Sequence, residues 1–268
     1  MGKKSLADYS SLLFELASED RLNILLLLKR NPLKLSHVSA KLDFTVQETS
    51  RNIARLSDTG LIKKDVEGLY HLTGYGEETL NLLSGFRFLF KNREYFQNHT
   101  LAALPPRFRS SIGILESSDF VNDIMLTFHN VELMITKANE HVWILSDQIL
   151  ASTLPYLEKA IDRNVQFHLI LPSDYALPES ISPLITSPNF RKAVRSGSVD
   201  VRSIPKIDAF LCVSENELSA LSFPTSQGKL EYTAFKTTNK TIIEWSEALF
   251  LHYWNQACAQ APQQLNPI

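Results

Sequence analysis

One short stretch, FTVQETSRNIARLSDTGLIKK at residues 44–64, restricts the local fold more than any other part of the chain. Thr45 and Glu48 form the Thr-x-x-Glu pattern of a capping box, in which each side chain satisfies a backbone N–H at a helix start. Gly60 stands where a helix commonly ends in a left-handed residue. Residues at helical spacing form the inward face of this helix: Thr49, Ile53 and Leu56. The stretch therefore predicts one amphipathic helix with defined ends.

Three further helices are predicted before this stretch. Leucines at helical spacing indicate a first helix over about residues 6–16. Ser18 is the expected N-cap of a second helix over residues 19–30, and Ser36 is the expected N-cap of a short third helix. The third and fourth helices thus form a helix-turn-helix.

A hairpin and a long helix are predicted after the stretch. Residues 61–64 and 69–72 read as two short strands joined by a turn. A hairpin directly after a helix-turn-helix is a wing, so we predict a winged helix-turn-helix domain over residues 1–80. The helical pattern resumes from about Tyr75 and predicts a connecting helix over residues 81–104. This helix is apolar enough to pack on a partner subunit or on the second domain.

The pattern changes after a break near Pro105. A helical region is followed by predicted strands near residues 142–145, 165–171, 199–204, 209–213, 219–223 and 232–236. Helices alternate with the first of these strands, and an amphipathic helix over residues 240–259 closes the pattern. We predict an α/β domain over residues 105–260 with a mixed, mainly parallel sheet. Residues 261–268, rich in Gln and Pro, are expected to be a disordered tail.

Composition restricts the class of protein. The 268 residues are 44% hydrophobic and 21% charged, as in ordinary soluble proteins. No apolar run is long enough for a membrane span, and no secretory signal is recognisable, so we expect a cytoplasmic protein with no membrane partner. Cys212 and Cys258 are expected to be buried thiols rather than a disulfide.

The charge is distributed unevenly along the chain. Residues 1–75 contain 11 Lys and Arg against 9 Asp and Glu, a net charge of +2. The remaining residues contain 16 Lys and Arg against 20 Asp and Glu, a net charge of −4. This asymmetry permits DNA binding by the first half of the chain.

The outer face of the capped helix carries side chains that suit DNA. In the major groove Gln pairs with adenine and Arg with guanine, and Ser and Arg also bind phosphates. The candidate DNA-binding residues are Gln47, Glu48, Ser50, Arg51, Arg55, Lys63 and Lys64. The alternative is a solvated polar face, and the order of helices and hairpin favours double-stranded DNA. A homodimer is expected because two half-sites multiply affinity.

Four segments of the first 80 residues carry a family resemblance: residues 18–25, 35–42, 45–62 and 72–80. Their motifs and their order resemble those of ArsR-type winged-helix regulators. The segment IGIL at residues 112–115, Asp208-Ala209-Phe210 and the aromatic pattern from Trp245 to Trp254 resemble archaeal regulators of the methanogenesis regulatory protein family. The resemblance implies transcription control and a phospholipase-D-like second domain for regulation, dimerisation or both. One departure is Thr49, where this superfamily usually has an aliphatic residue.

No catalytic pattern accompanies this resemblance. Phospholipase D chemistry needs a His with a Lys two positions later, and none of the seven histidines has one. His168 is expected to be a strand residue in polar surroundings. The sequence also lacks CxxC, HExxH, GxSxG and GxxxxGK[ST] motifs. We therefore predict a catalytically inactive protein, not an enzyme, with no cofactor and no metal site.

A small-molecule effector is possible in principle, but the sequence does not identify it. Two sets near predicted strand ends or in the last helix are candidates for an effector pocket: Asp147, Asp174 and Asp208, and Trp143, Trp245 and Trp254. Helix or turn capping for the acids and core packing for the tryptophans are the favoured interpretations. Three alternative functions stay open: a protein-interaction module, a degenerate phosphodiesterase, and a redox sensor that uses Cys212 and Cys258.

Overall fold

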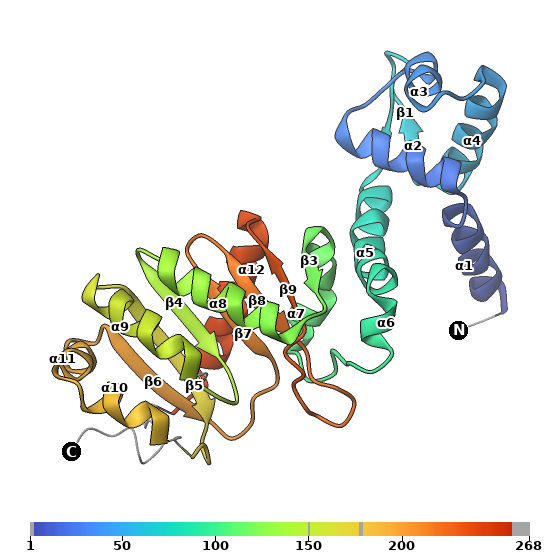
Figure 1. Ribbon diagram of the computed structural model, residues 1–268. Coiled ribbons are helices and arrows are strands. Elements are labelled where there is room, and N and C mark those ends of the chain that lie inside the picture. The colour runs from blue at the N-terminus through green and yellow to red at the C-terminus, as the bar shows by residue number, and fades with distance from the viewer. Residues whose placement is uncertain (1–2, 150, 177–178, 259–268) are drawn as a thin grey trace. The chain divides into compact units, whose positions relative to one another are not determined.

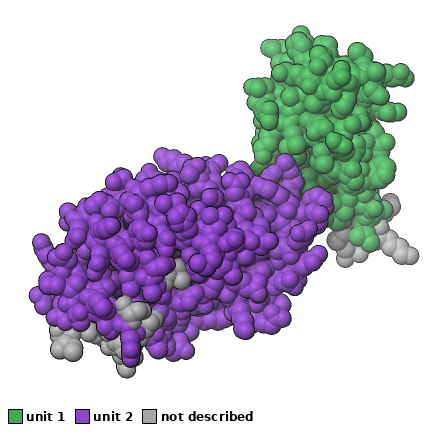
Figure 2. Space-filling view, viewed as in Figure 1, with its two compact units in different colours: residues 1–86 green, residues 87–268 purple. Residues whose placement is uncertain are grey.

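The computed structural model describes residues 3–149, 151–176 and 179–258. The chain divides into two compact units, residues 1–86 (unit 1) and residues 87–268 (unit 2), coloured separately in Figure 2. The division falls in helix α5 (Gly74–Lys91), inside the predicted connecting segment 81–104. The predicted disordered tail, residues 261–268, lies outside the described residues.

Unit 1 contains four helices, a hairpin and the beginning of α5 (Figure 1). The elements that precede α5 are α1 (Lys3–Leu16), α2 (Glu19–Arg30), α3 (Leu35–Leu42), α4 (Val46–Asp58), β1 (Ile62–Lys64) and β2 (Tyr70–Leu72). Ser18 occupies the N-cap position of α2, as predicted, although its side chain makes no capping bond. The predicted cap Ser36 is wrong: Val38 N–H already bonds to the Lys34 carbonyl at 3.1 Å, so Lys34 is the N-cap of α3.

The ends of α4 are those that the sequence predicts. Thr45 Oγ1 accepts the Glu48 N–H at 3.2 Å, and Glu48 Oε2 accepts the Thr45 N–H at 3.0 Å, which completes the capping box. Gly60 has φ +75° after the last turn. Thr49 is fully buried, and its hydroxyl donates to the Thr45 carbonyl at 2.9 Å. This bond explains how a polar residue occupies an inward position.

The hairpin is antiparallel and is fixed to the rest of unit 1. The Asp65 carboxylate accepts the backbone N–H groups of Glu67 at 3.0 Å and Leu69 at 2.8 Å, which closes the turn. Leu33, in the connection between α2 and α3, exchanges two backbone hydrogen bonds with Tyr70 at 3.1 and 2.8 Å. The hairpin therefore continues into a third, one-residue strand, which restrains its direction.

The start of α5 packs backbone to backbone against the end of α4. Thr73 Oγ1 donates to the Gly60 carbonyl at 2.6 Å and accepts the Gly76 N–H at 3.0 Å. A Cβ atom on Gly76 would lie 2.1 Å from the Leu61 carbonyl oxygen, a distance that no side chain can occupy. Only glycine fits here.

Unit 2 is built on a seven-stranded sheet in the order β3-β9-β8-β7-β4-β5-β6 (Figure 1). The strands are β3 (Asp119–Val121), β4 (His141–Leu145), β5 (Gln166–Pro172), β6 (Val199–Ile204), β7 (Phe210–Ser214), β8 (Leu218–Ser222) and β9 (Ala234–Thr237). The predicted α/β fold with a mixed sheet is confirmed. Parallel pairing is limited to β4, β5 and β6, which are neighbours in the sheet and are joined by helical crossovers; the other pairs are antiparallel.

Helices cover both faces of this sheet. The long ones are α8 (Ile124–Lys137), α9 (Leu154–Asp162), α11 (Pro188–Ser196) and α12 (Lys240–Trp254). Shorter ones are α6 (Arg93–Phe96), α7 (Pro106–Ser110), η1 (Ile112–Ser117), η2 (Ala151–Thr153), η3 (Glu179–Ile181) and α10 (Ser182–Thr186). Val142 and Phe167 pack with α8, α9 and α11, whereas Leu145 and Ile170 pack with α12. Among the described residues, no helix of either unit is long and apolar enough to cross a membrane.

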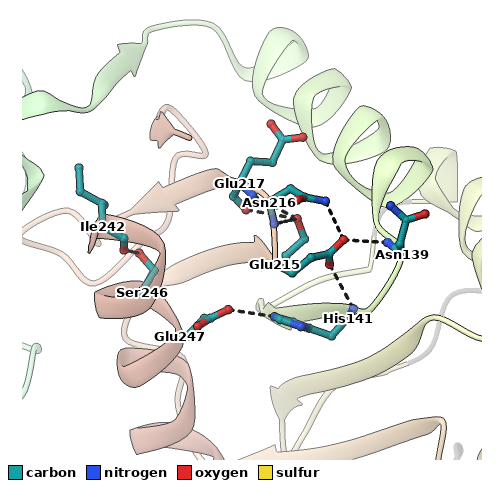
Figure 3. A network of polar contacts seen from close by, with 9 residues as sticks. Asn139, His141, Glu215, Asn216, Glu217, Ile242, Ser246 and Glu247 are labelled. Carbon is teal, nitrogen blue, oxygen red and sulfur yellow. Dashed lines mark hydrogen bonds and ion pairs between the residues drawn. The ribbon is translucent and has the colours of Figure 1, made fainter. Parts of the chain in front are cut away.

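A polar network ties the start of β4 to the β7–β8 turn and to α12 (Figure 3). The Glu215 carboxylate accepts the backbone N–H groups of Asn139 at 2.8 Å and His141 at 3.2 Å. Burial acts to raise the pKa of Glu215, but these backbone donors outweigh burial, so the pKa lies below its ordinary value. His141 Nε2 lies 3.0 Å from Glu247 Oε1 on α12.

We predict that Gly76→Ala lowers the free energy of unfolding of unit 1 by about 3 kcal/mol, because backbone atoms must move to admit the methyl group. The matched control is Gly74→Ala, where an added Cβ meets no atom within 4 Å. This control is expected to change stability by no more than about 0.5 kcal/mol. Urea unfolding followed by circular dichroism measures both, and equal losses would contradict the assignment of a tight contact.

Candidate nucleic-acid interface

Helices α3 and α4 form a helix-turn-helix with a three-residue turn, residues 43–45. Asp43 ends α3 in the left-handed conformation, with φ 55° and ψ 39°, and its N–H donates to the Ser39 carbonyl. The Ser39 hydroxyl donates to the Phe44 carbonyl at 2.7 Å. These local bonds fix the direction in which α4 leaves the turn.

Three of the predicted DNA-binding residues lie together on the exposed face of the first two turns of α4. Gln47, Ser50 and Arg51 are exposed. Their side chains make no hydrogen bond and no salt bridge with the residues that the structure describes. Val46, exposed to 63% at the start of the same helix, adds an apolar group that the sequence analysis did not consider. The four side chains offer donors, acceptors and a methyl surface from one rigid helix.

Glu48 has a structural role that competes with its predicted contact to DNA. Besides the two backbone bonds of the capping box, its Oε2 accepts the Thr45 hydroxyl at 2.7 Å. This hydroxyl bond is the main reason that the pKa of Glu48 lies below its ordinary value. The carboxylate therefore stays ionised at the helix start, where it stabilises α4 and repels a phosphate.

Arg55 was also predicted to bind DNA, and the structure gives it a structural contact that competes with this prediction. Its Nε and Nη2 atoms donate to Glu15 Oε2 at 2.9 Å and Oε1 at 2.5 Å. The guanidinium also lies 5.4 Å from the centroid of the Phe14 ring. Arg55 thus joins α4 to α1, and its donors already have a carboxylate partner.

Glu15 connects three helices through two arginines. Its side chain is 8% exposed, and Arg21 Nε on α2 lies 2.9 Å from its Oε2. Arg21 also donates to the Glu15 and Phe14 carbonyls at 2.9 and 3.0 Å. The hydrogen bond from Arg55 is the largest influence on Glu15 and holds its pKa below the ordinary value of 4.5, against the effect of burial. We call Glu15, Arg21 and Arg55 the Glu15 clamp.

The sequence analysis missed the clamp, although one signal was present. Glu15 precedes Leu16 and follows Leu12 by three positions, so an acidic residue stands on the apolar face of the first predicted helix. A buried carboxylate needs cationic partners. The sequence did not indicate which arginines would pair with Glu15.

The two hairpin lysines, Lys63 and Lys64, are exposed, as predicted. Because neighbouring strand residues point to opposite faces, the two ammonium groups lie on opposite sides of the hairpin. Lys64 Nζ lies 5.5 Å from the centroid of the Tyr70 ring, a cation–π contact. Exposed acids such as Asp43, Asp58 and Glu67 stand on the same elements, so the surface carries mixed charge.

In unit 2, the three tryptophans pack in the core, which is the interpretation that the sequence favoured. Trp245 and Trp254 lie on the buried face of α12, and Trp143 packs partly buried against the same core. His168 was predicted to be a strand residue in polar surroundings, and its surroundings are partly polar and partly aromatic: Asp200 lies opposite it on β6, and its ring stacks on Trp254 at 4.5 Å and on Trp143 at 5.8 Å. Burial accordingly lowers the pKa of His168.

The aspartates and cysteines that the sequence singled out are not gathered into a site. Tyr232 donates its hydroxyl to Asp147 at 2.5 Å, Asp208 lies 3.3 Å from Lys206 Nζ, and Asp174 is exposed. Both cysteines are free; Cys212 is buried, as predicted, but Cys258 is exposed. Burial raises the pKa of the Cys212 thiol, which removes the reactive thiolate that a redox sensor needs.

No protein-family model matches the chain, and no curated protein matches it. Among solved structures, TrmBL2, an archaeal chromatin protein, aligns with 12% identity over 91% of this chain and 94% of its own, at a TM-score of 0.42. Nuc, a phospholipase D family member from Salmonella typhimurium, aligns with 10% identity over 49% of this chain and 88% of its own, at a TM-score of 0.35. At such scores these likenesses carry no argument about function.

We predict that Glu15→Gln lowers the free energy of unfolding of unit 1 by about 3 kcal/mol at neutral pH, because two arginines lose their carboxylate. The folded pKa of Glu15 is depressed, so its contribution is present above the unfolded value of 4.5 and is lost as the pH falls through the lower folded pKa. The difference between wild type and variant should therefore shrink in acid. Urea unfolding at several pH values measures it.

The matched control is Glu67→Gln on the exposed hairpin turn, which removes the same charge without a cationic partner. Its unfolding curve should follow that of the wild type at every pH. The ion-pair account would be ruled out if Glu15→Gln lost no more free energy of unfolding than this control, or if its loss persisted unchanged in acid.

Proposed function

We propose that this chain is a cytoplasmic, sequence-specific, DNA-binding transcription regulator whose helix α4 lies in the major groove. The observation that carries the proposal is the contrast between the two sides of α4. Its inner side is anchored by buried residues and by Arg55, whereas Gln47, Ser50 and Arg51 make no hydrogen bond or salt bridge with the described residues. Rigid presentation of unpaired donors and acceptors is what base recognition requires.

Each exposed residue of this face has a defined chemical role in the proposal. Gln47 has the donor and acceptor pair that matches adenine, and Arg51 has the paired donors that match guanine. Ser50 is suited to a phosphate, and Val46 to the methyl group of thymine. Lys63 and Lys64, on the two faces of the hairpin that acts as the wing, are the cations available there to phosphates beside the groove.

The mixed charge of this surface has a consequence for binding. With few unpaired cations, each bound chain releases only a few counterions, and affinity depends on salt less steeply than for a strongly basic protein. Discrimination between sequences therefore relies on the base contacts of α4. This feature supports a regulator of specific sites rather than a general DNA-coating protein.

Unit 2 has a regulatory rather than a catalytic role in this proposal. Phospholipase D chemistry uses a histidine as nucleophile, and His168 is the strand histidine considered for that role. Its ring is stacked between Trp143 and Trp254. A nucleophile must be open to its substrate. We therefore propose that unit 2 hydrolyses no phosphodiester.

Dimerisation is proposed through an apolar stripe on α5. Tyr75, Leu82 and Phe86 follow each other at intervals of seven and four residues, and their exposed fractions are 50%, 68% and 70%. Such spacing places them on one side of the helix. An exposed apolar stripe of this kind is suited to the same stripe on a second copy, which doubles the number of half-sites read.

The proposal is tested by selection of bound fragments from a random pool of double-stranded DNA. We predict that wild-type protein enriches one motif, and that Arg51→Ala binds the enriched site at least tenfold more weakly, about 1.4 kcal/mol, in fluorescence anisotropy. Arg51 is exposed and has no salt bridge within the described ranges, so the variant should keep the wild-type melting temperature.

The matched control is Lys192→Ala, which removes an exposed cation from α11 of unit 2. It should bind the site as wild type does. Equal weakening by both substitutions would mean general electrostatic attraction. The absence of any enriched motif for the wild type would sink the proposal and favour a helix-turn-helix that binds a protein.

We predict that Phe86→Asp converts a dimer into a monomer, because a charge cannot be buried in an apolar interface without a partner. Phe86 is 70% exposed in the single chain, so the fold itself should be retained. Analytical ultracentrifugation measures the mass. Val66→Asp, at the fully exposed tip of the hairpin, is the control and should stay dimeric. A dimeric Phe86→Asp would place the interface elsewhere.

A further inference from the structure

Unit 2 contains a cavity between its sheet and the helices on the α9 side. Strands form the floor, with Ile144 on β4, Leu169 on β5 and Val201 on β6, and helices α9, α10 and α11 contribute walls that include Leu157 and Leu184. The cavity has a volume of about 80 Å³, compared with roughly 30 Å³ for one water molecule in the liquid. It is large enough for part of a small molecule.

The lining of this cavity is apolar. None of the residues that line it is Lys, Arg, Asp or Glu. His168 borders it, but the ring stacks on Trp254 of α12, and strand alternation places that ring on the opposite face of the sheet. The polar lining side chains other than His168 and Cys212 all come from the segment directly after β4: Ser146, Gln148 and Thr153. The ligand that fits is therefore mostly hydrocarbon, with polar atoms only at the segment 146–153.

The floor is open to solvent in a way that a packed core is not. Val142 and Phe167, on the same face of β4 and β5, are 0% and 5% exposed. Two residues further along each strand, Ile144 and Leu169 are only partly buried, although both strands lie inside the sheet. Leu171 on β5, two residues beyond Leu169 on the same face, is buried again at 0% exposure. The gap in the helical cover therefore lies over the middle of these strands.

We propose that this cavity is a binding site for a small, uncharged, mainly hydrocarbon molecule whose polar group faces Ser146, Gln148 and Thr153. A charged ligand is disfavoured, because the lining offers no opposite charge and an unpaired charge is costly to bury. Water that enters this open cavity finds few polar partners along the apolar floor, so an apolar group that displaces it gains free energy. A hydrocarbon ligand would instead restore the close packing that protein interiors normally have.

The proposed cavity site does not depend on DNA binding. The site lies wholly in unit 2, is formed by side chains of one sheet and of the helices that cover it, and binds its ligand without a cofactor. Binding can therefore be measured on the full chain with no DNA present. Failure of the DNA-binding proposal would leave this site standing, and the reverse also holds.

The test uses straight-chain alcohols as probes, titrated into the full-length chain and followed by saturation-transfer NMR. We expect 1-hexanol to bind saturably, and hexanoate, which has the same chain length but a charge, to bind at least tenfold more weakly. Equal binding of the two probes, or no saturable binding of 1-hexanol, would overturn the proposal.

Two variants locate the binding in the cavity. Val201→Phe extends a partly exposed floor residue into the cavity and should weaken the binding of 1-hexanol at least tenfold. Val66→Phe makes the same change on the hairpin tip and should bind as wild type does. Leu157→Ala enlarges the cavity and should bind 1-octanol at least threefold more tightly than wild type. A misfolded variant would lose affinity for 1-octanol rather than gain it. The expected gain in Leu157→Ala therefore keeps the proposal testable even where Val201→Phe fails to fold. Unchanged binding in both cavity variants would refute it.

Discussion

The Glu15 carboxylate is the interaction on which the arrangement of unit 1 depends. It lies almost fully buried between Arg21 and Arg55, which come from α2 and α4. A buried carboxylate is tolerated only when cations and hydrogen-bond donors compensate its lost hydration. Any rotation of α4 that moved Arg55 away would take one of its two cationic partners from this buried charge. The clamp therefore helps to fix which side of α4 faces outward, and with it the set of exposed side chains.

Around this clamp, the interface is made of parts with separate tasks. Glu48 and Thr45 stabilise the beginning of α4, and the Ser39 bond to Phe44 sets the turn before it. Gly76 allows α5 to approach the end of α4, which determines where the apolar stripe of α5 lies. The residues left without partners are few, and the charge around them is mixed. In the proposed function, recognition by such a surface rests on a small number of well-placed contacts, multiplied by pairing of two chains.

The sequence predicted those features whose causes lie within a few residues of each other. The capping box, the left-handed Gly60, the hairpin turn and the boundaries of β6 all follow from local chemistry, and each is present. Contacts between distant segments were not predictable: Arg55 and Glu15 are 40 residues apart, and no spacing rule links them. β3 has three residues, too few to produce a pattern. The extent of parallel pairing and the apolar cavity depend on how strands and helices from separate segments assemble, which the pattern of each segment does not contain.

The central claim is that the outward face of α4, held by the Glu15 clamp, touches DNA. Affinity cleavage tests it directly, with an iron chelate attached to Ser50→Cys in a Cys258→Ser background. Cys212 is buried and stays unlabelled, so all cutting reports on position 50. We predict cuts at a few adjacent positions in the major groove of the selected site. The wild-type chain, labelled at its exposed Cys258 in unit 2, is the reference. Scattered cutting that matches this reference, or no cutting, would contradict the account.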